Sequence, residues 1–175
     1  MPTRHAPSIA PHRIDRRRVL LAGVAVAAIS GCGFRMRGPQ PLAFSTLYVG
    51  VDGNSELGAA LRRRVLTSGT TRGVDDPASA DARLEVTHNS RTREILSLSA
   101  AGKVREYTLL QVLTFRLVGR AGNALLAPVT LTVRREYNFD DSQVIAKEQE
   151  EALLFRDMEN DLLQQLMDRL ATVRP

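Results

Sequence analysis

The residue with the clearest chemical context in this chain of 175 residues is Cys32. Three arginines, Arg16 to Arg18, precede an apolar stretch of about ten residues, which is too short to cross a bilayer as a helix. The stretch ends in Ile29-Ser30-Gly31-Cys32, the pattern of a bacterial lipobox, in which the Cys thiol is acylated and the chain is cut before it. The sequence therefore predicts a signal peptide over residues 1–31 and a mature chain that begins at a lipidated Cys32.

Cysteine content favours the same interpretation, because Cys32 is the only cysteine and an unpaired cysteine in an exported protein needs an explanation. Acylation by a diacylglycerol and an N-acyl chain supplies one, and two or three acyl chains anchor a protein firmly. Gly33 follows the cysteine where the inner-membrane retention signal has Asp, so we expect an anchor in the outer membrane, on its periplasmic side. The alternatives are a transmembrane anchor or an ordinary secretory signal with a chance cysteine, and export by either the general or the twin-arginine route.

Removal of the signal peptide changes the charge of the protein. The whole chain has 24 Lys and Arg against 19 Asp and Glu, but five of the basic residues and one of the acidic residues precede Cys32. The mature chain is thus nearly neutral, which argues against a nucleic-acid partner. The remaining charges are unevenly spread, since residues 33–137 carry 15 basic and 9 acidic residues whereas residues 138–175 carry 4 and 9. One part of the fold is expected to be basic and the other acidic.

Residues 32–43 are rich in Gly and Pro and are predicted to form a lipidated tether, followed by a single domain over residues 44–175. Hydrophobic periodicity predicts the order β-α-β-β-β-α. The predicted elements are a strand over 44–51, a helix capped by Ser55 and ending near Gly69, three strands from Ala82 onward with turns at 100–102 and 119–123, and a helix from Asp140 or Asp141 to about Val173. The expected fold is an α+β two-layer sandwich, a four-stranded antiparallel or mixed sheet with both helices on one face.

The sequence gives little support for catalysis. His88 is the one histidine of the predicted mature chain, and strand alternation continuing from Val86 predicts that it is partly buried. Nucleophile-elbow, phosphate-loop and dinucleotide-binding motifs are missing from the sequence. We therefore expect a protein that is not an enzyme and binds no metal or cofactor other than its covalent lipid.

A binding role has better support, because the face of the sheet away from the helices is predicted to be rich in arginine and threonine. The arginines expected there are Arg83, Arg91 or Arg93, Arg116 and Arg134. Guanidinium groups bind phosphate in a bidentate manner, so this face could hold an anionic glycolipid. A solvated face and a face covered by a partner protein are the alternatives. On the last helix, the stripe from Phe155 to Val173 is expected to be core, with acidic residues such as Glu151, Glu159 and Asp161 opposite it.

Several short motifs follow one another along the mature chain. They are Cys32 to Gly38 (CGFRMRG), Leu96 to Ser99 before Gly102 and Glu106-Tyr107, Arg135 to Asp140 (REYNFD), and Ala146 to Glu151 (AKEQEE). In this order, after a lipobox, they resemble the LPS-assembly lipoproteins of the LptE family over essentially the whole mature chain. That family has a small sheet with two helices packed on one side.

The resemblance implies that the protein is not an enzyme and acts at the outer membrane. Members form a complex with the β-barrel LptD, act as its plug and assembly factor, and bind lipopolysaccharide (LPS). The family's LPS-contacting basic residues carry over onto Lys147 and onto a position near Ala100, where this chain lacks a cation, so Lys103 and Arg105 become the candidates there. The alternative function is a lipid-anchored periplasmic scaffold, or an auxiliary lipoprotein of another envelope transport machine, that binds no glycolipid.

Overall fold

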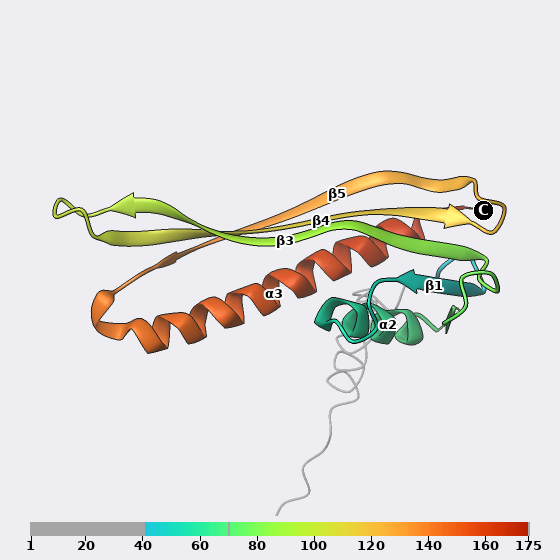
Figure 1. The fold of residues 1–175 in the computed structure, drawn as a ribbon, viewed down its shortest axis with the longest axis horizontal. Helices are drawn as coiled ribbons and strands as arrows, with labels where there is room; N and C mark the ends of the chain where they lie inside the picture. The colour runs from blue at the N-terminus through green and yellow to red at the C-terminus, as the bar shows by residue number, and fades with distance from the viewer. Residues whose placement is uncertain (1–40, 70, 175) are drawn as a thin grey trace, which may run out of the picture. The chain divides into compact units, whose positions relative to one another are not determined.

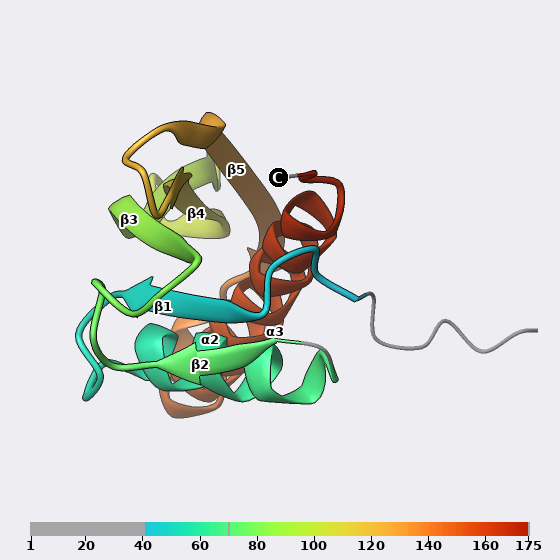
Figure 2. The same cartoon turned by 90° about the vertical axis from the view of Figure 1, so that its right-hand side faces the viewer.

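The computed structural model describes residues 41–69 and 71–174, so the predicted signal peptide, Cys32 and most of the tether lie outside the described residues. The strands form one mixed sheet in the order β2-β1-β3-β4-β5 (Figures 1 and 2). Their bounds are Thr46–Gly50 for β1, Arg72–Val74 for β2, Ala82–Leu98 for β3, Val104–Gly119 for β4 and Ala124–Asn138 for β5. β1 pairs in parallel with both β2 and β3, whereas β3, β4 and β5 pair antiparallel.

The prediction of an α+β sandwich is confirmed, but the prediction of four strands was wrong. The additional strand, β2, has three residues and includes Gly73, so it is too short for an alternation of buried and exposed side chains to identify it. Its place at the sheet edge beside β1 follows from Arg72, whose amide donates to the carbonyl of Ser45 at 2.8 Å.

Both predicted helices are present. α2 spans Glu56–Thr67, and the Ser55 side chain caps it by accepting a hydrogen bond from the amide of Gly58 at 3.0 Å. The C-terminal helix begins with a 3-10 turn, η1 (Asp141–Gln143), which continues as α3 (Val144–Ala171). Asp140 caps this segment by accepting from the amide of Ser142 at 2.9 Å.

The core lies between one face of the sheet and the two helices (Figure 2). β4 contributes alternate residues that are fully buried, and α3 contributes its predicted stripe. These residues are Leu109, Leu113, Phe115 and Leu117 from β4 and Met158, Leu162, Leu166 and Leu170 from α3. Arg64 of α2 donates hydrogen bonds to Asn160 and Gln164 of α3, which joins the two helices on the same side of the sheet.

A β-bulge in β3 changes which face its side chains occupy. Val86 pairs with Phe115 and His88 pairs with Thr114, so Thr87 is an extra residue in β3. Because side chains alternate between faces, one extra residue moves every later side chain to the opposite face. His88 is therefore exposed on the open face instead of partly buried, and the prediction for it was wrong.

The same bulge corrects the prediction for two arginines. Arg91 and Arg93 pair with Gln111 and Leu109, which are both fully buried, so the two arginines lie on the helix side of the sheet and not on its open face. The prediction for Arg116 agrees with the structure, since it alternates with the buried Phe115 and Leu117 and pairs with Glu85 across the open face.

Candidate functional site

The three residues that the sequence suggested for LPS binding line one groove. This distal groove has a volume of about 800 Å³ and is formed by the β3–β4 turn, the start of β4, the end of β5 and the segment from η1 into α3. Lys103 and Arg105 come from the first two of these elements, and Lys147 comes from the first turn of α3. Tertiary structure thus brings together cations that lie far apart in the sequence.

Local backbone geometry positions Lys103. The β3–β4 turn is closed by the amide of Ser99, which donates to the carbonyl of Lys103 at 2.7 Å. Gly102 within the turn has a φ of 74°, a conformation that glycine adopts without steric cost. The side chain of Lys103 extends to η1, the 3-10 turn that precedes α3, where its ammonium contacts the carboxylate of Asp141 at 2.9 Å.

The three cations of the distal groove differ in their exposure and in their pairing. Lys103 is 69% exposed, and the hydrogen bond from its ammonium to Asp141 raises its pKa above the ordinary value. The Lys147 side chain is only 19% exposed, and it is paired with Glu150 one turn along the helix at 2.8 Å. The Arg105 side chain is exposed and has no partner among residues 41–69 and 71–174. The Lys103–Asp141 ion pair is exposed on both sides and is worth little, so an anionic ligand can replace Asp141 at small cost.

Exposed apolar side chains surround this end of the molecule. Leu98 at the end of β3 is 55% exposed, and Val144 and Ile145 at the start of α3 are 42% and 74% exposed. Leu98 directly precedes Ser99, and Val144 directly follows Gln143; Ser99 and Gln143 both line the distal groove. The combination of clustered cations with neighbouring apolar side chains suits a ligand that carries both phosphate groups and hydrocarbon chains.

A polar network joins the first turns of α3 to the sheet. Glu151 accepts hydrogen bonds from the hydroxyl of Tyr137 at 2.5 Å and from Arg93 at 2.8 Å, so it joins α3 to β5 and to β3. The Arg93 guanidinium lies 4.7 Å from the centre of the Tyr107 ring, which in turn stacks on Tyr137. Since Lys147 lies one helical turn before Glu151, this network also positions Lys147.

Acidic residues of α3 face the sheet more often than the sequence suggested. Glu151, Glu159 and Asp161 were expected opposite the apolar stripe, but they form ion pairs with Arg93, Arg91 and Arg135 of the sheet. The uneven charge distribution along the sequence therefore leads to ion pairs within the domain. Basic residues of the strands and acidic residues of α3 neutralise each other where the sheet packs against the helix.

The Tyr137 network predicts a pH dependence of stability. Burial, together with the hydrogen bond to Glu151, raises the pKa of Tyr137 from 10.0 to about 12. A raised pKa favours the protonated folded state, so the stabilisation is complete below pH 10 and is lost as pH rises toward 12. We expect the free energy of unfolding, measured with urea, to fall over this range, and to fall less in Tyr137→Phe. Equal pH dependence in the variant and the parent would contradict the assignment to Tyr137.

The part of the chain that the structure describes offers neither a metal site nor a spanning helix. In residues 41–69 and 71–174, no cluster of three or more His, Cys, Asp or Glu residues could hold a metal ion. None of the described helices is long and apolar enough to cross a bilayer. His88 contacts the hydroxyl of Ser90 at 3.0 Å on the exposed face.

Comparison with known proteins assigns the fold to a family. The model of the family described as "LptE: Lipopolysaccharide-assembly" matches residues 44–170, which is most of the chain. The chain belongs to the LptE family. This membership confirms the resemblance noted in the sequence.

LptE relatives are similar along most of their length. A protein of Pectobacterium atrosepticum named "LPS-assembly lipoprotein LptE" is 29% identical over 157 residues, which cover 88% of this chain and 84% of the relative. A protein of Yersinia enterocolitica with the same name is 28% identical and covers 93% of this chain and 77% of its own. Both names describe assembly lipoproteins and neither describes an enzyme.

Solved structures agree with the LptE fold. The solution structure of lipoprotein B from Nitrosomonas europaea has a TM-score of 0.70 at 29% identity and covers 79% of this chain and 90% of its own. The crystal structure of rare lipoprotein B from Shewanella oneidensis has a TM-score of 0.64 at 26% identity, and the match covers 73% of this chain and 95% of the Shewanella chain. The sheet and the two helices are therefore a shared architecture.

Proposed function

We propose that this chain is an outer-membrane lipoprotein that assembles LPS at the cell surface together with an LptD-type β-barrel, as barrel plug, assembly factor and LPS-binding component. Family membership supports the assembly role, and the names of the relatives describe the same task. In this proposal Cys32 carries the lipid anchor on the periplasmic side of the outer membrane, and the domain performs no catalysis.

The observation that carries the LPS-binding role is the convergence of Lys103, Arg105 and Lys147 on the distal groove. LPS presents phosphate groups next to acyl chains, so it needs cations and apolar surface side by side. The groove provides the cations, while Leu98 and Ile145 provide apolar surface at its borders. In our proposal, phosphate oxygens replace Asp141 and Glu150 as the partners of the two lysines.

Replacing Lys103, Arg105 and Lys147 together with alanine is expected to weaken LPS binding about tenfold. If each cation forms an ion pair with phosphate that is worth roughly 0.5 kcal/mol, three contribute about 1.5 kcal/mol, which is close to a factor of ten in affinity. The measurement is titration of the detergent-solubilised protein with fluorescent LPS. Replacing the exposed Arg63, Arg72 and Arg169 with alanine removes the same charge from residues outside the groove and is the matched control.

Copurification separates the LPS-binding role from the partnership with the barrel. We expect the triple alanine variant to copurify with a large β-barrel from solubilised outer membrane in the same near-equal amount as the parent. Unchanged LPS affinity would remove these residues from the binding site. Absence of a barrel partner for the parent protein would instead favour the scaffold alternative.

A further inference from the structure

One edge of β3 is left unpaired over most of its length. β1 pairs only with residues from Ala82 to Glu85, whereas β4 pairs with β3 almost to its end. Between His88 and Ile95 the β3–β4 register runs without interruption, and in the described sheet no strand lies on the other side of this stretch. Alternate backbone N–H and C=O groups there point away from the sheet, where an added strand can pair with them.

This edge has few of the features that prevent strand addition. The stretch from His88 to Ile95 contains no proline, lysine or bulge. Its two arginines point toward α3, where Glu159 and Glu151 neutralise them. The β5 edge differs, because it contains Pro128 and the consecutive charged residues 134–136.

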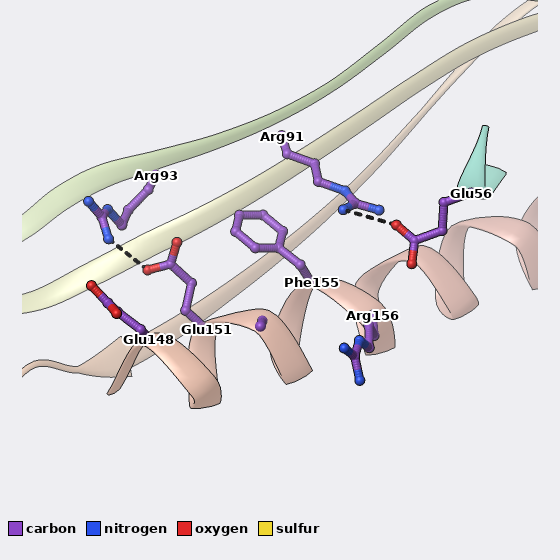
Figure 3. Close-up of a pocket in the computed structure, with 8 residues that line it drawn as sticks. Glu56, Arg91, Arg93, Glu148, Glu151, Phe155 and Arg156 are labelled. Carbon is purple, nitrogen blue, oxygen red and sulfur yellow. Dashed lines mark hydrogen bonds and ion pairs between the residues drawn. The ribbon is translucent and has the colours of Figure 1, made fainter. Parts of the chain in front are cut away.

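A groove opens directly beside this edge. The edge groove has a volume of about 510 Å³ and is bordered by β3, by α3 and by Glu56 at the start of α2. Figure 3 shows Arg91 and Arg93 extending from β3 toward α3, with the Phe155 ring between them. Residues of β4 and β5 do not line the edge groove, so the groove lies on the side of β3 away from β4. Alternate side chains of a strand added to this side of β3 would project into the edge groove. The edge groove and the distal groove share no lining residue.

Two charges in the edge groove lack a partner. Arg91 and Arg93 are paired with carboxylates, but Glu148 and Arg156 contact no opposite charge within the described residues. They lie eight residues apart on α3, which corresponds to about 12 Å of helix. A strand covers that distance in about four residues, and residues four apart lie on the same face of a strand.

We propose that the β3 edge from His88 to Ile95 binds an extended segment of a partner protein by antiparallel strand addition. Antiparallel pairing is the more stable arrangement per residue, and it makes the added segment run in the same direction as α3. The segment therefore carries a basic residue that pairs with Glu148 and, four residues later, an acidic residue that pairs with Arg156. The residue midway between them is apolar and packs on Ala152 and Phe155.

Charge complementarity favours a different polypeptide over a second copy of this chain. Within His88 to Ile95, the residues four apart are His88 and Thr92, Asn89 and Arg93, Ser90 and Glu94, and Arg91 and Ile95. None of these pairs combines a basic with an acidic side chain. A second copy of β3 would therefore leave at least one of Glu148 and Arg156 without a partner.

A designed peptide tests this proposal. The probe is a nine-residue peptide of threonines with lysine at its third position, valine at its fifth and glutamate at its seventh, added to the full chain in detergent micelles. We expect amide hydrogen exchange to slow at alternate residues from His88 to Ile95. A peptide with lysine and glutamate exchanged is expected to bind roughly threefold to tenfold more weakly, because both ion pairs become repulsive.

A charge-swapped protein provides the specificity control. Glu148→Lys combined with Arg156→Glu is expected to prefer the exchanged peptide, and both side chains are exposed, so the fold should be unaffected. Arg63→Glu with Asp157→Lys makes the same swap at exposed residues outside the groove and should keep the original preference. Unchanged exchange at His88 to Ile95 with both peptides would overturn the proposal. The proposal would also be overturned if the protein without peptide showed slow amide exchange at this edge and had the mass of a dimer. The strand bound at the edge would then belong to a second copy of the chain.

Discussion

Replacing Cys32 with serine is expected to abolish lipidation and release the protein from the membrane. The predicted lipobox contains the only thiol in the chain, and a serine hydroxyl cannot form the thioether that would link a diacylglycerol to the protein. In the proposed function, the acyl chains on Cys32 anchor the protein to the membrane. A single acyl chain gives only reversible binding, whereas two or more hold a protein stably on a membrane.

Incorporation of a labelled palmitate analogue and flotation of the purified protein with lipid vesicles measure this effect. The parent should be labelled and float, whereas Cys32→Ser should be unlabelled and remain at the bottom of the gradient. Thr132→Ser, at an exposed position of β5, is the control and should behave like the parent. A Cys32→Ser protein that keeps residues 1–31 and still floats would support the transmembrane-anchor interpretation instead.

Replacing Phe115 with alanine is expected to lower the free energy of unfolding by about 3–5 kcal/mol. Phe115 is fully buried on the helix side of β4, where the removed ring would leave a cavity that the packed core closes only in part. Domains of this kind have a total stability of about 5–15 kcal/mol, so a large share would be lost. Urea unfolding at pH 7 measures the change as a lower midpoint with an unchanged slope.

Leu153→Ala is the matched control for the core substitution. Leu153 lies on α3 but is 57% exposed, so its truncation should change stability by less than about 0.5 kcal/mol. If Phe115→Ala lost less than about 1 kcal/mol, the packing of β4 against the helices would not be the main source of stability. The distal groove depends on this packing, because β4 and α3 both contribute to it.

Local signals in the sequence identified the elements that bury an apolar stripe. The alternation in β4 and the three- and four-residue spacing in α3 require no knowledge of the partner surface, because each element has one apolar side. The Ser55 cap was identifiable for the same reason, since a cap is satisfied within a few residues of the chain, and the cap of the last helix was narrowed to Asp140 or Asp141, of which the structure has Asp140. β2 gave no such signal in three residues.

Candidate binding residues were identified by resemblance and not by physical pattern. Lys103, Arg105 and Lys147 follow no periodicity that distinguishes them from other surface cations, and only the fold brings them to one groove. The edge groove was missed, because Glu148 and Arg156 look like ordinary exposed charges on a helix. Their eight-residue spacing matters only beside an unpaired strand edge.

By itself the sequence determined the α+β class, four of the five strands, both helices and the apolar stripes, all of which depend on residues close together in the chain. The lipobox at Cys32 is a prediction of the same local kind. Tertiary structure decided which face each charge occupies. A single extra residue, Thr87, moves Arg91 and Arg93 to the helix side of the sheet, where Glu159 and Glu151 neutralise them. Strand register depends on pairing between distant segments, so a bulge that reverses the faces of half a strand is visible only once the strands are paired.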